Sequence, residues 1–147
     1  DIQVVGFKPY WLGNMTYPYV YMTAVNYTSE FQIMTKYVLT SASPKSLSLV
    51  GVQGNVGDDS KLGLTQAIGA GGAKLQYIPE QPGTPDFTPI ATQLKSNGSD
   101  WVFLILTPTD TGELIKAMNR IGFTPHLAAW AGMGDQSYID AFGSVSL

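Results

Sequence analysis

Trp101-Val102-Phe103-Leu104-Ile105-Leu106 is the stretch that decides the fold, because its apolar residues follow one another without a polar interruption. A strand with one wet face shows polar residues at every second position, whereas a strand covered on both faces is apolar throughout. We therefore predict that residues 101–106 form a central strand of a sheet with helices on both faces. Val50, Phe103 and Ile105 are expected to be buried there.

Four further strand-like runs lie on either side of this one, at intervals of about 25 residues, which suits repeated βα units. They are Tyr19–Thr23, Leu47–Val52, Ala73–Ile78 and His126–Trp130. Helical patterns lie between the runs. This alternation predicts an α/β protein with three layers (αβα), in which a mostly parallel, doubly wound sheet is built by right-handed crossovers.

The run over residues 73–78 differs from the central strand in its pattern. Ala73, Leu75 and Tyr77 alternate with Lys74 and Gln76. Such alternation indicates a strand with one packed face and one wet face.

Polar residues at the expected positions mark where the helices begin. Ser29 with Gln32 resembles a capping box, and aspartates at a helix start favour the positive end of the helix dipole. The predicted helix starts are Ser29, Asp58, Asp86 and Asp110, and a short last helix is predicted over Ser137–Phe142.

Composition excludes several classes of function. The chain has 147 residues, of which 44% are hydrophobic and 13% charged, so it is one folded domain and not a disordered tail. Its net charge is −3 and its basic residues are scattered, which argues against a nucleic-acid partner. No cysteine is present, so a disulfide framework, a thiolate zinc site and a cysteine nucleophile are excluded. No apolar run approaches the roughly 18 residues of a membrane span.

The glycines at positions 51, 54 and 57 invite comparison with a dinucleotide-binding turn. Their spacing is GxxGxxG and not GxGxxG, and the aspartates at 58 and 59 would repel a pyrophosphate. A simple glycine-rich turn is favoured, and no cofactor is predicted.

The sequence gives no positive support for catalysis. His126 is the only histidine, it lies at the start of a predicted strand, and no GxSxG elbow is present. A structural or solvated histidine is the favoured interpretation. The spacing of acidic residues does not match an EF-hand, so no metal site is predicted.

Five segments in order resemble the type I periplasmic solute-binding proteins, the family that binds branched-chain amino acids for ABC importers. They are Pro18–Thr23, Leu47–Gly57, Pro85–Lys95, Ser99–Leu104 and Leu114–Gly122. The resemblance covers nearly the whole chain but matches only the second lobe of that two-lobed family. It implies a flavodoxin-like or Rossmann-like lobe and a cleft that closes on a small solute.

The resemblance also implies a division of the chain. Residues 1–18 are expected to be the end of the first lobe and a hinge, with Tyr10 and Trp11 at the hinge or cleft. Residues 19–147 are expected to be the second lobe, incomplete at its C-terminus. The segment is interpreted as a piece of a longer chain, produced by proteolysis or by design. A separated lobe would expose Tyr10, Trp11 and Tyr17, so self-association is expected.

The function implied by the resemblance is that of an extracytoplasmic solute-binding component of an ABC importer. Its partners would be a small-molecule solute and a membrane permease. Its location would be periplasmic or extracellular, with lipid anchoring of the full-length protein left open. The alternative is a ligand-sensing domain of a receptor or regulator with the same fold.

Ligands of parallel sheets bind beyond the carboxyl ends of the strands, and the loops after the predicted strands are therefore the place to look. By position, the resemblance implies contacts from residues in three such loops. The candidate ligand-binding residues are Asn55, Val56, Thr107, Thr109, Asp110, Trp130, Ala131 and Met133.

One departure from the family bears on the ligand. The resemblance implies an acidic residue near position 131 that holds the ammonium group of an amino acid, and this chain has Ala131. A buried ammonium without a carboxylate is costly. Asp110 and Asp135 could substitute, although each has a competing role at a helix cap or in a loop. We therefore predict a small organic or aromatic carboxylate, enclosed by Trp130, Tyr10 and Trp11, in preference to a free α-amino acid.

Overall fold

The computed structural model describes residues 2–4, 20–22, 24–70, 72–136, 138 and 140. Its strands are β1 (Ile2–Val4), β2 (Val20–Met22), β3 (Ser46–Val52), β4 (Lys74–Glu80), β5 (Trp101–Ile105) and β6 (His126–Ala129). Its helices are α1 (Tyr27–Ala42), α2 (Asn55–Ile68), α3 (Thr88–Ser96), α4 (Pro108–Arg120) and the short 3₁₀ helix η2 (Ala131–Gly134).

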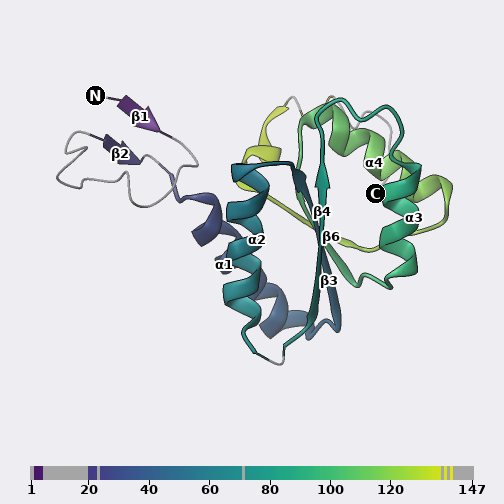
Figure 1. Ribbon diagram of the computed structural model, residues 1–147, viewed down its shortest axis with the longest axis horizontal. Coiled ribbons are helices and arrows are strands. Elements are labelled where there is room, and N and C mark those ends of the chain that lie inside the picture. The colour runs from purple at the N-terminus through teal and green to yellow at the C-terminus, as the bar shows by residue number, and fades with distance from the viewer. Residues whose placement is uncertain are drawn as a thin grey trace.

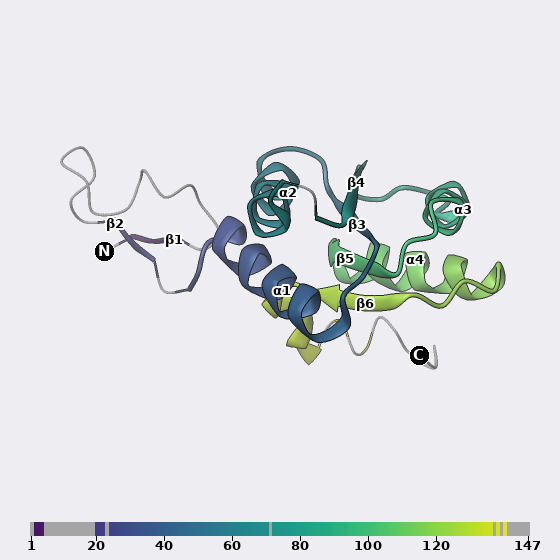
Figure 2. The same ribbon diagram turned by 90° about the horizontal axis from the view of Figure 1, so that it is seen from below.

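Four strands form one sheet in the order β4-β3-β5-β6, and every neighbouring pair is parallel. In register, Leu49 lies opposite Phe103 on one side of β3 and opposite Tyr77 on the other. Helices α1 and α2 cover one face of the sheet, and α3 and α4 cover the other (Figures 1 and 2). The predicted three-layer α/β fold with a parallel, doubly wound sheet is confirmed.

The apolar strand β5 supplies side chains to a core on each face. Phe103 and Ile105 pack with Phe31 of α1 under the first helix pair, whereas Val102 and Leu104 pack under the second. Phe103 is completely buried, as is Val50, and Ile105 is 3% exposed. The prediction that these three residues are buried is confirmed.

Strand β2 lies outside this sheet. It pairs in parallel with β1, and Ile2 lies opposite Val20. The strand predicted over residues 19–23 is therefore present, but its partner is a strand from the stretch predicted as the end of the first lobe. The boundary between lobes at residue 18 stays a prediction, and Tyr10, Trp11 and Tyr17 lie outside the described residues.

One face of the edge strand β4 is exposed at the start of the strand and buried at its end. Lys74 is exposed and Gln76 is half-buried, but Ile78 and Glu80 on the same face are buried. The prediction of a wet face thus holds only at the start of the strand, because α3 and the 81–87 segment cover its end.

Backbone geometry in β4 explains how a proline fits there. The Gln53 N–H donates to the Glu80 carbonyl at 2.7 Å, so the backbone groups of Glu80 point toward β3. Backbone groups alternate in direction along a strand, and those of the preceding Pro79 therefore point outward.

Two local features explain why glycine is needed in the turn after β3. Gly54, which precedes α2, has φ +107°, a conformation that favours glycine. At Gly57 a Cβ atom would lie 2.2 Å from the Tyr77 hydroxyl oxygen, so only glycine fits. Helix α2 begins at Asn55 and not at Asp58 as predicted, because Gly54 turns the chain directly into the helix.

Two other helix starts also differ from the prediction. The cap of α1 is Asn26, whose side-chain oxygen accepts from the Ser29 N–H at 2.8 Å, so the capping box assigned to Ser29 is wrong. Thr107 and not Asp110 caps α4. The predicted role of Asp86 at the start of α3 is confirmed, because its carboxylate accepts a hydrogen bond from the Thr88 N–H at 2.9 Å. Of the last predicted helix, Ser137–Phe142, residues 138 and 140 are described, and both are helical, as is residue 136 just before it.

Replacement of Phe103 by alanine should remove the side chain that joins β5 to α1. We expect a loss of about 3–5 kcal/mol in the free energy of unfolding, because the cavity lies in a closed core. Urea denaturation followed by circular dichroism measures it. The control is Leu62→Ala, whose parent side chain is 46% exposed. Equal urea midpoints for the two variants would contradict the core described above.

Candidate ligand-binding site

The carboxyl ends of the four parallel strands meet at one edge of the sheet, which we call the ligand edge. It comprises residues 53–56 after β3, 81–84 after β4, 107–110 after β5 and 130–134 after β6. The chain leaves β3 toward β4 on one side and leaves β5 toward β6 on the other. Consequently α2 and α4 start on opposite faces of the sheet beside two neighbouring strands. Such a switch point is where open α/β sheets bind ligands.

The first turn of α2 presents its backbone at this edge. Gly54 has no side chain with which to cap the helix, and the structure shows no side-chain cap. The first backbone N–H groups of a helix lack intrahelical partners and carry the positive end of its dipole. Asn55 is exposed, while Val56 packs on the α1–α2 core. Asn55 is thus the better placed of these two candidates to meet a solute.

The first turn of α4 is organised by a pair of side chains. The Thr107 hydroxyl donates to Asp110 Oδ2 at 2.7 Å and accepts from the Asp110 N–H at 3.2 Å. Asp110 is 4% exposed, and its Oδ2 also lies 3.4 Å from the Gly83 N–H. Both groups serve the helix start, and the exposed Thr109 is the candidate in this turn that reaches solvent.

The segment after β6 brings the remaining candidates to the same edge. The Trp130 ring is half-buried and makes edge-to-face contacts with Tyr27 at 6.1 Å and Tyr138 at 6.3 Å between ring centroids. Met133 packs on the α3–α4 core, whereas Ala131 is exposed. Trp130 therefore packs against the α1–α2 core and also borders the ligand edge.

Helix α1 contributes an acidic residue that sequence analysis missed. The Ala131 N–H donates to Glu30 Oε1, so a carboxylate lies directly beside position 131. Burial raises the pKa of Tyr27, in the same helical turn, and the charge of Glu30 raises that pKa further. The sequence did not indicate that Glu30 lies beside Ala131, because the two residues are 101 positions apart. The available signal was topological, since a helix that leads into a parallel strand starts at the edge where such strands end.

Glu80, the last residue of β4, is a second acidic residue that was missed. It is 2% exposed, and among the described residues neither of its carboxylate oxygens has a hydrogen-bond partner. Burial raises the pKa of Glu80. The hydroxyl and the N–H of Thr84 lie near enough to lower that pKa in part, although both donate to the Gln81 carbonyl, and the negative charge of Asp110 raises it. An acid in such surroundings favours its neutral form.

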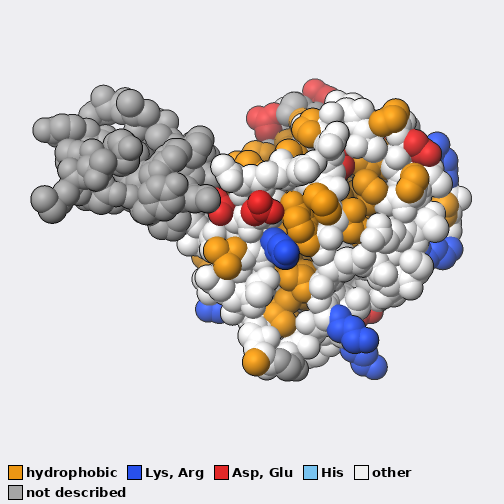
Figure 3. Space-filling view, in the orientation of Figure 1, with side chains coloured by type: hydrophobic (Ala, Val, Ile, Leu, Met, Phe, Trp, Pro, Cys, Tyr) orange, Lys and Arg blue, Asp and Glu red, His pale blue; other side chains and the backbone are white. Residues whose placement is uncertain are grey.

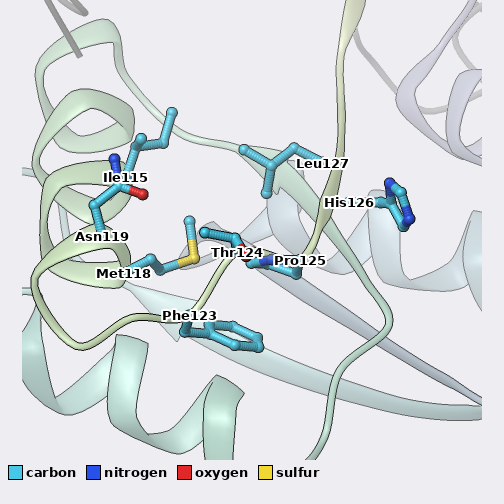
Figure 4. Close-up of a pocket in the computed structure, with 8 residues that line it drawn as sticks. All are labelled: Ile115, Met118, Asn119, Phe123, Thr124, Pro125, His126 and Leu127. Atoms are coloured by element: carbon cyan, nitrogen blue, oxygen red, sulfur yellow. The ribbon is translucent and has the colours of Figure 1, made fainter. Parts of the chain in front are cut away.

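Two hollows in the described surface lie away from the ligand edge. One, of about 290 Å³, lies between the end of α4 and residues 123–127 (Figure 4), and its lining is mostly apolar. His126 borders it, is exposed, and stacks on Trp101 with 4.9 Å between ring centroids. The other, of about 260 Å³, lies between α2 and β4, where Figure 3 shows a band of hydrophobic side chains.

Within the described ranges, no group of three or more His, Cys, Asp or Glu residues is placed to hold a metal ion. In that same portion of the chain, the helices are too short or too polar to cross a membrane.

Comparison with known families gives a match over residues 2–145 to the model described as periplasmic binding protein. The chain belongs to this family. A search of curated protein sequences found no match. The resemblance noted in the sequence is thus confirmed at the level of the family.

Solved structures of the family share the fold. An extracellular ligand-binding receptor from Rhodopseudomonas palustris HaA2 is 19% identical with a TM-score of 0.76, over 86% of this chain and 35% of that one. The branched-chain amino acid transporter substrate-binding protein LivJ from Streptococcus pneumoniae, solved with isoleucine, is 13% identical with a TM-score of 0.73, over 85% and 36%.

A third similar structure is the solute-binding protein of an ABC transporter from Rhodopseudomonas palustris HaA2, solved in complex with p-hydroxybenzoic acid. It is 20% identical with a TM-score of 0.63, over 76% of this chain and 32% of that one. This periplasmic binding protein chain therefore spans about a third of the length of these structures.

Replacement of Thr107 by alanine should remove the cap of α4 and leave the Asp110 N–H without its partner. We expect a loss of about 1 kcal/mol in the free energy of unfolding, measured by urea denaturation. Thr107→Ser keeps the hydroxyl and should retain most of the stability. A serine variant as unstable as the alanine variant would show that the methyl group, and not the cap, matters.

Proposed function

We propose that the chain is the ligand-binding second lobe of an extracytoplasmic solute-binding protein of an ABC importer. We further propose that it takes an amino acid or related small carboxylate at the ligand edge, and that organic or aromatic carboxylates are preferred. The observation that carries the proposal is the convergence of the α2 and α4 starts on the switch point between β3 and β5, beside Trp130.

The chemistry of the edge suits such a ligand. A carboxylate is stabilised by free backbone N–H groups and by the positive dipole ends of helices. Asn55 and Thr109 are exposed in those two turns and can add side-chain hydrogen bonds. Trp130 offers the flat apolar surface that an aromatic ring requires. Similar folds carry both ligand types, since one structure holds p-hydroxybenzoic acid and another holds isoleucine.

A free amino acid is the second candidate ligand, and Glu30 favours it. Its carboxylate lies on the Ala131 amide, so the edge contains a negative group near the position where the sequence lacks one. An ammonium group placed there would have a partner. The buried Asp110 is already engaged with Thr107 and is a poorer partner.

The remaining elements of the proposal concern the whole protein. Its location would be periplasmic or extracellular, free or lipid-anchored, and its macromolecular partner a membrane permease. The role is binding and not catalysis. A sensor domain with the same fold is the alternative, and the domains encoded next to this chain in the full reading frame would decide between the two.

Ligand class can be tested by titration of the chain followed by two-dimensional NMR. With benzoate and 4-hydroxybenzoate, we expect shifts of the Asn55, Thr109 and Ala131 amides, because these lie at the ligand edge. Leucine at equal concentration should shift them less. Amides at the opposite end of the molecule, such as that of Gly122, serve as the internal control.

The variant Glu30→Gln separates the two ligand classes. It removes the negative charge but keeps a group that accepts from the Ala131 N–H. Benzoate binding should be unchanged. A strong leucine response in the parent chain that is lost in this variant would establish the amino acid as the ligand and overturn the preference for carboxylates.

A site shared between two lobes should be weak in one lobe alone, because small-molecule sites bury about 70–90% of the ligand. We expect this chain to bind the ligand of the full-length protein at least a hundredfold more weakly, roughly 2.7 kcal/mol by calorimetry. Equal affinity would place the whole site within this lobe.

Self-association is a further part of the proposal, because the division of the chain proposed from the sequence puts the aromatic residues Tyr10, Trp11 and Tyr17 at or beside a hinge that the other lobe would cover. Sedimentation velocity over a concentration series should show dimers or larger species. Removal of residues 1–18 should reduce them. A strict monomer at every concentration would contradict the argument.

A further inference from the structure

The most unusual buried group in the described structure is the carboxyl group of Glu80. It lies at the end of β4, under the 81–84 segment, with 2% of the residue exposed. Its two oxygens lack hydrogen-bond partners among the described residues. The hydroxyl and the N–H of Thr84, which lower the pKa of Glu80 in part, both donate to the Gln81 carbonyl, at 2.8 and 3.1 Å. A buried ionised carboxylate in this position would be costly.

A second carboxylate, that of Asp110, faces the same region from α4. It is 4% exposed and accepts a hydrogen bond from the Thr107 hydroxyl at 2.7 Å, while the Asp110 N–H donates to the Thr107 hydroxyl oxygen at 3.2 Å. These contacts hold the Asp110 carboxylate at the start of α4, beside the 81–84 segment. Two negative charges cannot be accommodated together at low dielectric without compensation, and no basic side chain acts on Glu80 among the groups that influence its ionisation.

The elements around this pair are joined by hydrogen bonds. The Gly83 N–H points to Asp110 Oδ2 at 3.4 Å, which links the 81–84 segment to α4. The Gln53 N–H donates to the Glu80 carbonyl at 2.7 Å, and the side chains of Gln53 and Gln81 are 3.1 Å apart. Glu80 therefore lies among three of the four segments of the ligand edge, residues 53–56, 81–84 and 107–110, which these contacts link to one another.

We propose that Glu80 is a neutral carboxylic acid whose burial allows the 81–84 segment to stay packed against the start of α4, an arrangement that we call the lock, and that ionisation of Glu80 loosens this part of the ligand edge. The lock is closed at acidic pH and opens as the pH rises, because a negative Glu80 repels Asp110 and needs water. That opening also weakens solute binding is a second step, which rests on the function proposed above.

The direction of the pH effect follows from linkage. Burial and Asp110 together raise the pKa of Glu80 in the folded chain above the ordinary value of 4.5. The stabilisation by neutral Glu80 is therefore complete below pH 4.5 and is lost as the pH rises through the raised pKa.

The test is a pH titration of the chain by NMR, with the glutamate side-chain carboxyl carbons observed directly. Glu80 should titrate at a higher pH than the exposed Glu113, which is paired with Lys116 and serves as the internal standard. The amides of Gly83, Thr109 and Asp110 should shift with the midpoint of Glu80. In Asp110→Asn the Glu80 midpoint should fall, because the neighbouring charge is gone. Glu80 and Glu113 midpoints that coincide would overturn the proposal.

Stability supplies an independent measurement. Glu80→Gln imitates the neutral acid, so its urea midpoint at neutral pH should equal or exceed that of the parent chain. The fall in midpoint of the parent between acidic and neutral pH should be reduced in this variant. Glu113→Gln should retain the parental fall. A Glu80→Gln variant that keeps the full parental pH dependence would contradict the lock.

The binding step has its own outcome. With 4-hydroxybenzoate as the probe, the parent chain should bind more tightly below the Glu80 midpoint than above it, and Glu80→Gln should lose that difference. If the probe binds equally at both pH values while the titration behaves as expected, the lock does not act on binding and the second step is wrong. If no carboxylate or amino acid shifts the edge amides at either pH, the proposed function fails, and the lock stands or falls on the two preceding measurements.

Discussion

The burial of β5 on both faces is the constraint on which the rest of the structure depends. Its side chains alternate between two cores, with Phe103 on one side and Leu104 on the other. Neither face tolerates water, so one helix pair has to cover each. A parallel sheet needs crossover connections of that kind, and helices are the usual solution. The three layers thus follow from the demands of one strand.

The place of the ligand edge follows from the same constraint. Parallel strands all end at one side, and every helix that follows a strand starts there. Because the chain moves outward in both directions from the β3–β5 pair, the starts of α2 and α4 lie on either side of it. Helix α1 leads into β3 from the same side and brings Glu30 to the residues that follow β6. Groups that are remote in sequence meet at this edge without any long loop.

Sequence analysis predicted most of the architecture because hydrophobic periodicity determines which segments are strands. The runs around Val50 and Phe103 were found, and their parallel pairing was correct. The candidate residues do follow the carboxyl ends of the strands, while their role in binding stays a prediction. The helix starts were less predictable. Asn26 begins α1 through its side-chain oxygen, and Gly54 begins α2 through its backbone conformation, whereas the sequence pattern pointed to Ser29 and Asp58. Capping residues are short-range features, and several polar residues near a helix start are plausible caps from sequence.

The acidic residues of the edge were missed for a different reason. Glu80 follows an alternating pattern that indicates a wet face, and only the coverage of its strand end by later segments buries it. Glu30 reads as an ordinary residue in the first turn of a helix, and only the topology places it on the Ala131 amide. Contacts between separate βα units carry no periodic signal in the sequence.

Pro79 affects which edge of the sheet can accept a further strand. Its backbone points away from β3, so the outer side of β4 lacks a hydrogen-bond donor at that position. A strand approaching from outside would leave one of its carbonyl groups unpaired, which is how natural proteins protect an exposed edge against unwanted association. The opposite edge, β6, consists of His126, Leu127, Ala128 and Ala129 and contains no proline. Further strands can therefore be added beside β6 at lower cost than beside β4, and any larger sheet built on this lobe should extend from that side.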